Sequence, residues 1–119
     1  MNELTALREI LGDLLDMAPA EIQAESYLVR DLVVESIDLL EIAVYVNSTF
    51  GIEVNDDELF LRSLRVHLTH TPEAEQLPVL QAEYPHLPQT RLTEILDDLE
   101  DGPVLQVRDL VDYIQWKKA

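Results

Sequence analysis

Apolar residues recur at intervals of three and four along most of the chain, which is the spacing of one face of an α-helix. The first run predicts a helix over about residues 3–16, with Asn2 as its N-terminal cap, and the second predicts a helix over residues 37–49. Three further helices are predicted over about residues 56–68, 91–100 and 106–117. No stretch alternates apolar and polar residues as a half-buried strand does. The pattern therefore predicts an all-α protein, built as a helical bundle.

The predicted helix over residues 37–49 is apolar on two sides. One stripe suits a core and consists of Leu39, Ile42, Ala43, Val46 and Phe50. The second stripe contains Ile37, Leu40 and Val44, at positions i, i+3 and i+7. Either the helix is buried nearly all round, or the second stripe meets a partner protein.

Two long segments lack a sustained helical period. Residues 18–34 predict a long structured loop that ends beside Ser36. Four prolines interrupt the chain after residue 68, and this stretch predicts an irregular connector with at most a short helix around residues 77–83. Asn55, followed three residues later by Glu58, predicts a capping box at the start of the third helix.

The composition indicates how many domains the chain forms and which compartment it occupies. With 119 residues, 47% of them hydrophobic, the chain can build one small core, so we expect a single domain over residues 1–119. The absence of cysteine fits a reducing compartment. The first residues do not follow a signal-peptide pattern, and no apolar run is long enough to span a bilayer. These features predict a cytoplasmic protein without membrane insertion, and we expect a monomer.

Charge narrows the range of partners. The chain has 24 acidic and 8 basic residues, and its formal net charge of −16 argues against nucleic acid and anionic membranes. A third of the acids lie in a segment without Lys or Arg, namely Asp31, Glu35, Asp38, Glu41, Glu53, Asp56, Asp57 and Glu58. Such a run is either a solvated face or a surface that steers a basic protein partner.

Ser36 directly precedes the apolar run of the second predicted helix. A serine there can accept a hydrogen bond from the first-turn amides, so Ser36 is predicted to be the N-cap. A helix N-terminus also favours anions, and a phosphate on this hydroxyl would lie in a partly favourable field.

Catalytic and metal-binding patterns are weak. Ser36 has no histidine at a recognisable spacing, and the three glycines form no phosphate-binding loop. His67, His70 and Glu73 could be metal ligands, although a solvated surface is the favoured interpretation. We therefore predict neither an enzyme nor a metal site.

Six segments of the chain follow an order and spacing known from one protein family. They are Asp31-Leu32, Ser36-Ile37-Asp38, Glu41, Phe50-Gly51-Ile52-Glu53-Val54, Asp56-Asp57-Glu58 and Val107-Arg108-Asp109-Leu110-Val111-Asp112-Tyr113-Ile114. With them the chain resembles the acyl carrier protein family over roughly residues 3–58 and 104–116. The resemblance implies a bundle of three main helices plus a short one. It also implies that a phosphopantetheinyl transferase attaches 4′-phosphopantetheine to Ser36. The thiol of this group then carries an acyl chain in fatty acid, lipid or polyketide biosynthesis.

The resemblance further implies a docking surface for acyl-transferring or ketosynthase-type enzymes with basic surfaces. This surface consists of Glu35, Ile37, Asp38, Leu40, Glu41 and Val44. The chain departs from the family in having Val33 in place of a common Gly, Glu35 in place of Asp, and an insertion at about residues 59–103. The alternative is an unmodified acidic helical module that binds a basic protein.

Overall fold

The computed structural model describes residues 2–119, and its regular secondary structure is helical. Its elements are α1 Glu3–Leu15, η1 Pro19–Glu21, α2 Ser36–Phe50, α3 Asp56–Phe60, α4 Leu64–Leu68, α5 Glu73–Glu83, α6 Gln89–Asp98, η2 Leu99–Asp101 and α7 Val107–Lys118. Within these residues there is no strand, only an isolated antiparallel bridge between Tyr27 and Gln106. The predicted all-α fold is confirmed.

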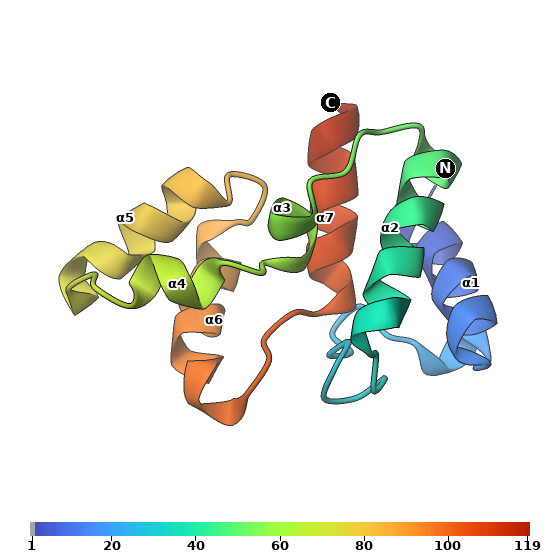
Figure 1. The fold of residues 1–119 in the computed structure, drawn as a ribbon, viewed down its shortest axis with the longest axis horizontal. Helices are drawn as coiled ribbons and strands as arrows, with labels where there is room; N and C mark the ends of the chain where they lie inside the picture. The colour runs from blue at the N-terminus through green and yellow to red at the C-terminus, as the bar shows by residue number, and fades with distance from the viewer. Residues whose placement is uncertain (1) are drawn as a thin grey trace.

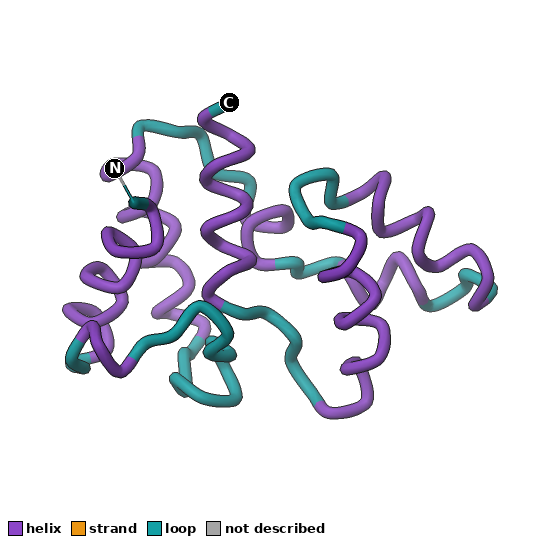
Figure 2. Tube along the Cα trace, turned by 180° about the vertical axis from the view of Figure 1, so that it is seen from behind, coloured by secondary structure: helices purple, strands orange, loops and turns teal. Residues whose placement is uncertain are grey.

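The helices form two groups, which meet along α7. Helices α1, α2 and α7 stand side by side in one half of the molecule, and α4, α5 and α6 form the other (Figure 1). The short helix α3 packs against α7 between the two groups. Seen from behind, the loops that lead from α3 to α4 and from α6 to α7 connect the two halves (Figure 2). The insertion at residues 59–103 therefore builds most of the second group.

Helix α1 begins and ends close to its predicted limits. The Asn2 side chain accepts hydrogen bonds from the backbone N–H groups of Leu4 and Thr5, which confirms it as the cap. Leu7 and Leu11 on the inner face are fully buried. The helix ends at Asp16, whose φ of 57° takes the chain into the left-handed region.

Helix α2 presents its predicted core stripe to the interior. Ile42 and Val46 are fully buried, and the rest of this stripe packs against the core while partly exposed. Gly51, with φ of 65°, ends the helix in the left-handed conformation that glycine adopts without a steric penalty.

The single helix predicted over residues 56–68 is wrong. The chain breaks at Leu61, which has φ of 55°, and continues as two five-residue helices. Two features stabilise this break. The Leu61 side chain is buried, and the Asp57 carboxylate accepts a 2.6 Å hydrogen bond from the Ser63 N–H. Tertiary burial here overrides the regular spacing of leucines.

The predicted capping box at α3 forms only in part. Asn55 Oδ1 accepts the N–H of Glu58 at 3.0 Å, as expected. The Asn55 N–H, however, donates to the Tyr113 hydroxyl of α7 and not to the Glu58 side chain. The cap thereby also fixes α3 to α7.

The irregular connector predicted after residue 68 is also wrong, because α5 is an eleven-residue helix with Pro78 in its interior. A proline inside a helix removes one backbone hydrogen bond and costs about 3 kcal/mol. Burial offsets this cost, since α5 packs between α4 and α6 and covers Leu80 and Tyr84 completely. The insertion is therefore an ordered helical unit.

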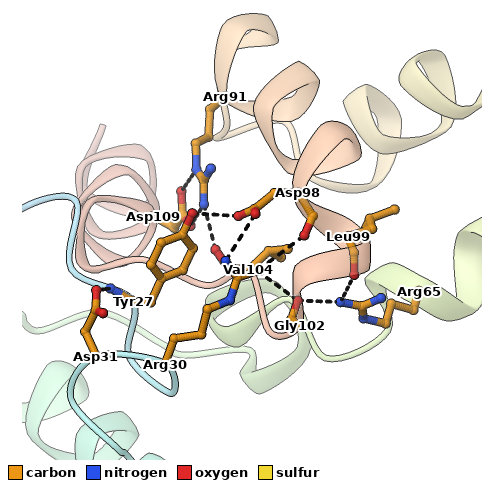
Figure 3. A network of polar contacts seen from close by, with 10 residues as sticks. All are labelled: Tyr27, Arg30, Asp31, Arg65, Arg91, Asp98, Leu99, Gly102, Val104 and Asp109. Atoms are coloured by element: carbon orange, nitrogen blue, oxygen red, sulfur yellow. Dashed lines mark hydrogen bonds and ion pairs between the residues drawn. The ribbon is translucent and has the colours of Figure 1, made fainter.

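A buried ion pair joins this unit to α7. The Arg91 guanidinium of α6 contacts both carboxylate oxygens of Asp109, at 2.7 and 2.9 Å, and donates to the Val104 carbonyl at 2.7 Å (Figure 3). Arg91 is 3% exposed and Asp109 is fully buried. Although burial opposes the charge, the Asp109 carboxylate holds the pKa of Arg91 above its usual value.

A second polar network joins the far end of α6 to the loop that precedes α2. The Tyr27 hydroxyl donates to Asp98 at 2.6 Å, and Arg30 contacts the same carboxylate at 3.1 Å (Figure 3). The hydrogen bond from Tyr27, with a further contribution from Arg30, holds the pKa of Asp98 below its usual value. Arg30 and Arg65 also both donate to the Gly102 carbonyl.

An aromatic cluster joins the end of α5 and the loop after it to α7. The His86 ring packs edge-on against Tyr84 and Tyr113 and lies 5.8 Å from the Trp116 ring. Burial lowers the pKa of His86 to about 4, so the imidazole is neutral at neutral pH.

The Arg91–Asp109 pair gives a stability prediction. We expect Arg91→Met to lower the free energy of unfolding by about 3–5 kcal/mol, because it leaves a buried carboxylate without its cation. The matched control is Glu94→Gln, which removes the exposed pair between Glu94 and Arg108 and is expected to cost less than about 1 kcal/mol. Urea unfolding measures both, and equal losses would contradict the prediction.

Candidate functional site

Ser36 is the first residue of α2 and not its N-cap, so that prediction is wrong by one position. Glu35 occupies the cap with an extended backbone, and the Asp38 carboxylate accepts the Glu35 N–H at 2.9 Å. Ser36 lies one residue past the cap, and its exposed hydroxyl has no hydrogen-bond partner among the described residues. It is available to react.

The charge around Ser36 has two opposing components. The N-terminus of the fifteen-residue helix α2 favours an anion. Glu35, Asp38 and Glu41 lie within two turns of Ser36 and repel one. In the described part of the chain, none of the ion pairs involves an acid from residues 31–58. The site therefore presents uncompensated negative charge to a partner.

The second apolar stripe of α2 is exposed, so the interpretation that the helix is buried all round is wrong. Ile37, Leu40 and Val44 are 60%, 57% and 65% exposed. With Glu41 and Tyr45 they line a shallow groove of about 430 Å³. Exposed apolar side chains that adjoin one another in this way are typical of a protein-binding surface. The structure thus brings four of the six predicted docking residues together on one helix face, namely Ile37, Leu40, Glu41 and Val44, and it adds Tyr45, which the spacing of the stripe did not identify. Glu35 and Asp38 lie beside this face, at the start of the helix.

The loop before Ser36 is held by the far end of the chain. The Leu28 N–H donates to the Leu105 carbonyl at 3.0 Å, and the Val107 N–H donates to the Ser26 carbonyl at 3.0 Å. Within the loop, the Val34 N–H returns to the Leu28 carbonyl at 2.9 Å. The segment is therefore a fixed support for the start of α2, as its length suggested.

Val33 has a strained backbone three residues before Ser36. Its φ is 55°, in the left-handed region that is unfavourable for a β-branched residue, and its side chain is 71% exposed. It is the position where, by the resemblance noted above, a Gly is expected. The departure noted in the sequence thus has a geometric counterpart.

A pocket of about 450 Å³ separates the start of α2 from the insertion. Leu39 and Val29 line one part of it, and the remaining residues come from 60–65 and 99–105. No local pattern in the chain predicts this pocket, because its walls come from segments that are distant in sequence.

The candidate metal ligands do not form a cluster. His67 lies 3.6 Å from Glu83, and no group of three or more His, Cys, Asp or Glu side chains in residues 2–119 is arranged to hold a metal. Over the same part of the chain, the helices are too short or too polar to cross a membrane.

Comparison with known proteins identifies the family. A family model described as a phosphopantetheine attachment site matches residues 5–66, about half of the chain. The acyl carrier protein of Thermobifida fusca (strain YX) is 38% identical over 56 residues, which cover 47% of this chain and 71% of that protein. That of Coprothermobacter proteolyticus is 42% identical over 53 residues, which cover 44% and 65%. The meromycolate extension acyl carrier protein of Mycobacterium leprae (strain TN) is 28% identical over 74 residues, which cover 61% and 64%.

The chain therefore belongs to the acyl carrier protein family, and its prosthetic group is a covalently bound 4′-phosphopantetheine. The matched segments span 64–71% of the length of these three relatives. The family match ends at residue 66, so most of the insertion lies outside it.

The strain at Val33 gives a second prediction. We expect Val33→Gly to raise the free energy of unfolding by about 0.5–1 kcal/mol, because it relieves roughly 1–2 kcal/mol of left-handed strain and loses part of that gain to the entropy of the unfolded chain. Val33→Ala keeps a Cβ and should gain less. Thermal unfolding compares the two variants, and an alanine variant as stable as the glycine variant would refute the strain.

Proposed function

We propose that Ser36 is the attachment site of 4′-phosphopantetheine and that the chain carries acyl intermediates on it. The observation that supports this most directly is the Ser36 hydroxyl itself, exposed at the start of α2 and unbonded among the described residues. When bound, the group supplies a thiol that holds the acyl chain as a thioester. The chain's own residues fix the point of attachment and present it to enzymes.

Ser36 acts as an acceptor and not as an independent nucleophile. No described side chain is bonded to its hydroxyl, and the buried His86 belongs to the aromatic cluster on α7. The base that activates the hydroxyl therefore comes from a phosphopantetheinyl transferase. The protein is a non-catalytic carrier in this proposal.

The docking surface is the exposed stripe of α2 together with the acids beside it. It comprises Glu35, Ile37, Asp38, Leu40, Glu41 and Val44, all on or next to the first three turns. Apolar contact supplies affinity, and the unpaired carboxylates select partners with basic surfaces. The partners we propose are the transferase and acyl-transferring or ketosynthase-type enzymes of fatty acid, lipid or polyketide biosynthesis.

Covalent modification tests the attachment site. Incubated with coenzyme A and a broad-specificity phosphopantetheinyl transferase, the protein is expected to gain the mass of one phosphopantetheine, and Ser36→Ala is expected to gain none. Ser48→Ala is the matched control, because Ser48 lies on the same helix and bonds only to backbone carbonyls. A modified Ser36→Ala variant would place the group elsewhere and defeat the proposal.

Kinetics of the same reaction test the docking surface. We expect Glu41→Gln to lower kcat/KM for modification by about 2- to 10-fold at low salt, with a smaller loss at high salt, because charges at an interface edge act mainly on association. Asp38 is unsuitable for this test because it also caps α2. Asp97→Asn, on the exposed side of α6, makes the same charge change and should leave kcat/KM unchanged. If Glu41→Gln and Asp97→Asn lowered kcat/KM equally, the effect would come from net charge and not from a docking contact.

A further inference from the structure

We infer that the pocket between α2 and the insertion receives the carboxylate end of an acyl chain carried on Ser36. This inference rests on the proposed function and goes beyond it by naming the chemical class of the cargo. Three observations support it: the position of the pocket relative to Ser36, the composition of its walls, and the state of two arginines at its edge.

The pocket begins next to the attachment site. Leu39, one of its lining residues, follows Ser36 by one helical turn, which is roughly 4.5 Å along the axis of α2. Val29 comes from the loop that leads to Ser36. At about 450 Å³ the pocket is in the range of small-molecule sites. A chain tethered at Ser36 can therefore enter it without leaving the protein surface.

Its walls are mainly apolar and come mainly from the insertion. They comprise Phe60, Leu61, Leu64, Leu99, Pro103, Val104 and Leu105. Such a lining suits methylene groups.

Two arginines, Arg62 and Arg65, also line the pocket. They belong to the segment 59–72, which contains no acidic residue in a chain with 24 acids. Among the described residues neither arginine forms an ion pair with a carboxylate. Two cations that no acid of the chain neutralises, at the edge of an apolar pocket, favour an anionic ligand.

The two arginines have different tasks. One terminal nitrogen of Arg65 donates to the carbonyls of Leu99 and Gly102, at 3.0 and 2.6 Å, and so fixes the pocket wall (Figure 3). Arg62 lies over the Phe60 ring at 5.8 Å and makes no hydrogen bond through its guanidinium within residues 2–119. Arg62 is therefore the group with free donors for a carboxylate.

The acids near these arginines do not neutralise them. The Asp57 carboxylate is used by the Ser63 N–H. Glu100 lines the pocket as well, so its edge carries two positive charges and one negative charge. The edge thus remains positive on a protein whose formal net charge is −16.

An anion delivered from Ser36 has two sources, the phosphate of the prosthetic group and a carboxylate on the cargo. The phosphate is ester-linked to the serine and stays beside it. The cargo lies at the other end of a long arm and is the part that can cross an apolar pocket. We therefore assign the arginine edge to a carboxylated acyl chain.

The test loads the protein with two acyl groups of equal length, using pentanoyl-CoA or glutaryl-CoA and a broad-specificity transferase. The glutaryl form is expected to unfold about 2–4 °C higher than the pentanoyl form. Simple charge repulsion predicts the opposite, because the glutaryl group adds a negative charge to an acidic protein. Arg62→Gln is expected to abolish the difference. Lys117→Gln, a distant substitution with the same charge change, should preserve it.

Each alternative outcome counts against a distinct claim. If no form of the protein is modified, the proposed function fails and the inference fails with it. If both acyl groups load but unfold at the same temperature, only the inference is overturned. The unfolding temperature could also rise, in an Arg62-dependent way, when phosphopantetheine is attached without an acyl group. That result would assign Arg62 to the phosphate and would overturn the inference. If Arg62→Gln does not fold, the test uses the NMR chemical shifts of the backbone amides of Arg62 and Arg65 in the wild-type protein. Identical shifts in the pentanoyl and glutaryl forms would refute the inference.

Discussion

The buried contact between Arg91 and Asp109 is the interaction on which the arrangement of the two helix groups depends. Both charges are removed from water, which is tolerable only when each polar atom finds a partner. Asp109 meets this condition by accepting two bonds from Arg91 and the N–H of Gln106 at the start of α7. The Asp109 carboxylate therefore both stabilises the start of α7 and anchors the insertion. If the insertion moved away from α7, Asp109 would lose the cation that compensates its buried charge.

The proposed attachment site, Ser36, is connected to this joint through a short series of contacts. Arg91 also holds the Val104 carbonyl, and the next residue, Leu105, accepts the N–H of Leu28 in the loop before α2. Asp98 on α6 binds Tyr27 in that same loop. The insertion thus does more than enlarge the protein, because it supports the backbone that leads to Ser36. A segment that lies mostly outside the family match is therefore coupled to the residue proposed as the attachment site.

Local patterns predicted most of the bundle and part of the site. Helices α1, α2, α6 and α7 follow from apolar periodicity, and the exposed stripe of α2 follows from a second period on the same helix. The break at Leu61 and the helix around Pro78 were missed because burial against distant elements overrides their local preference. Ser36 was misplaced by one residue, since two acids and not the serine form the helix start. The contact between Arg91 and Asp109 joins residues 18 apart and has no local signature.

The distribution of basic residues explains why the surface around Ser36 is so negative. All eight Lys and Arg side chains make contacts elsewhere: with acids in the case of Arg30, Arg91, Arg108 and Lys118, with backbone carbonyls for Arg8 and Arg65, and with aromatic rings for Arg62 and Lys117. Within residues 2–119 none of them pairs with an acid from residues 31–58. Carboxylates that repel one another without a cation cost stability. Asp38 and Asp57 offset part of this cost by accepting backbone N–H groups, whereas the side chain of Glu41 makes no hydrogen bond within residues 2–119. In the proposed complex, a basic partner would remove that repulsion, so the cost in the free protein would become affinity. The unpaired acids around Ser36 therefore support the proposed docking surface.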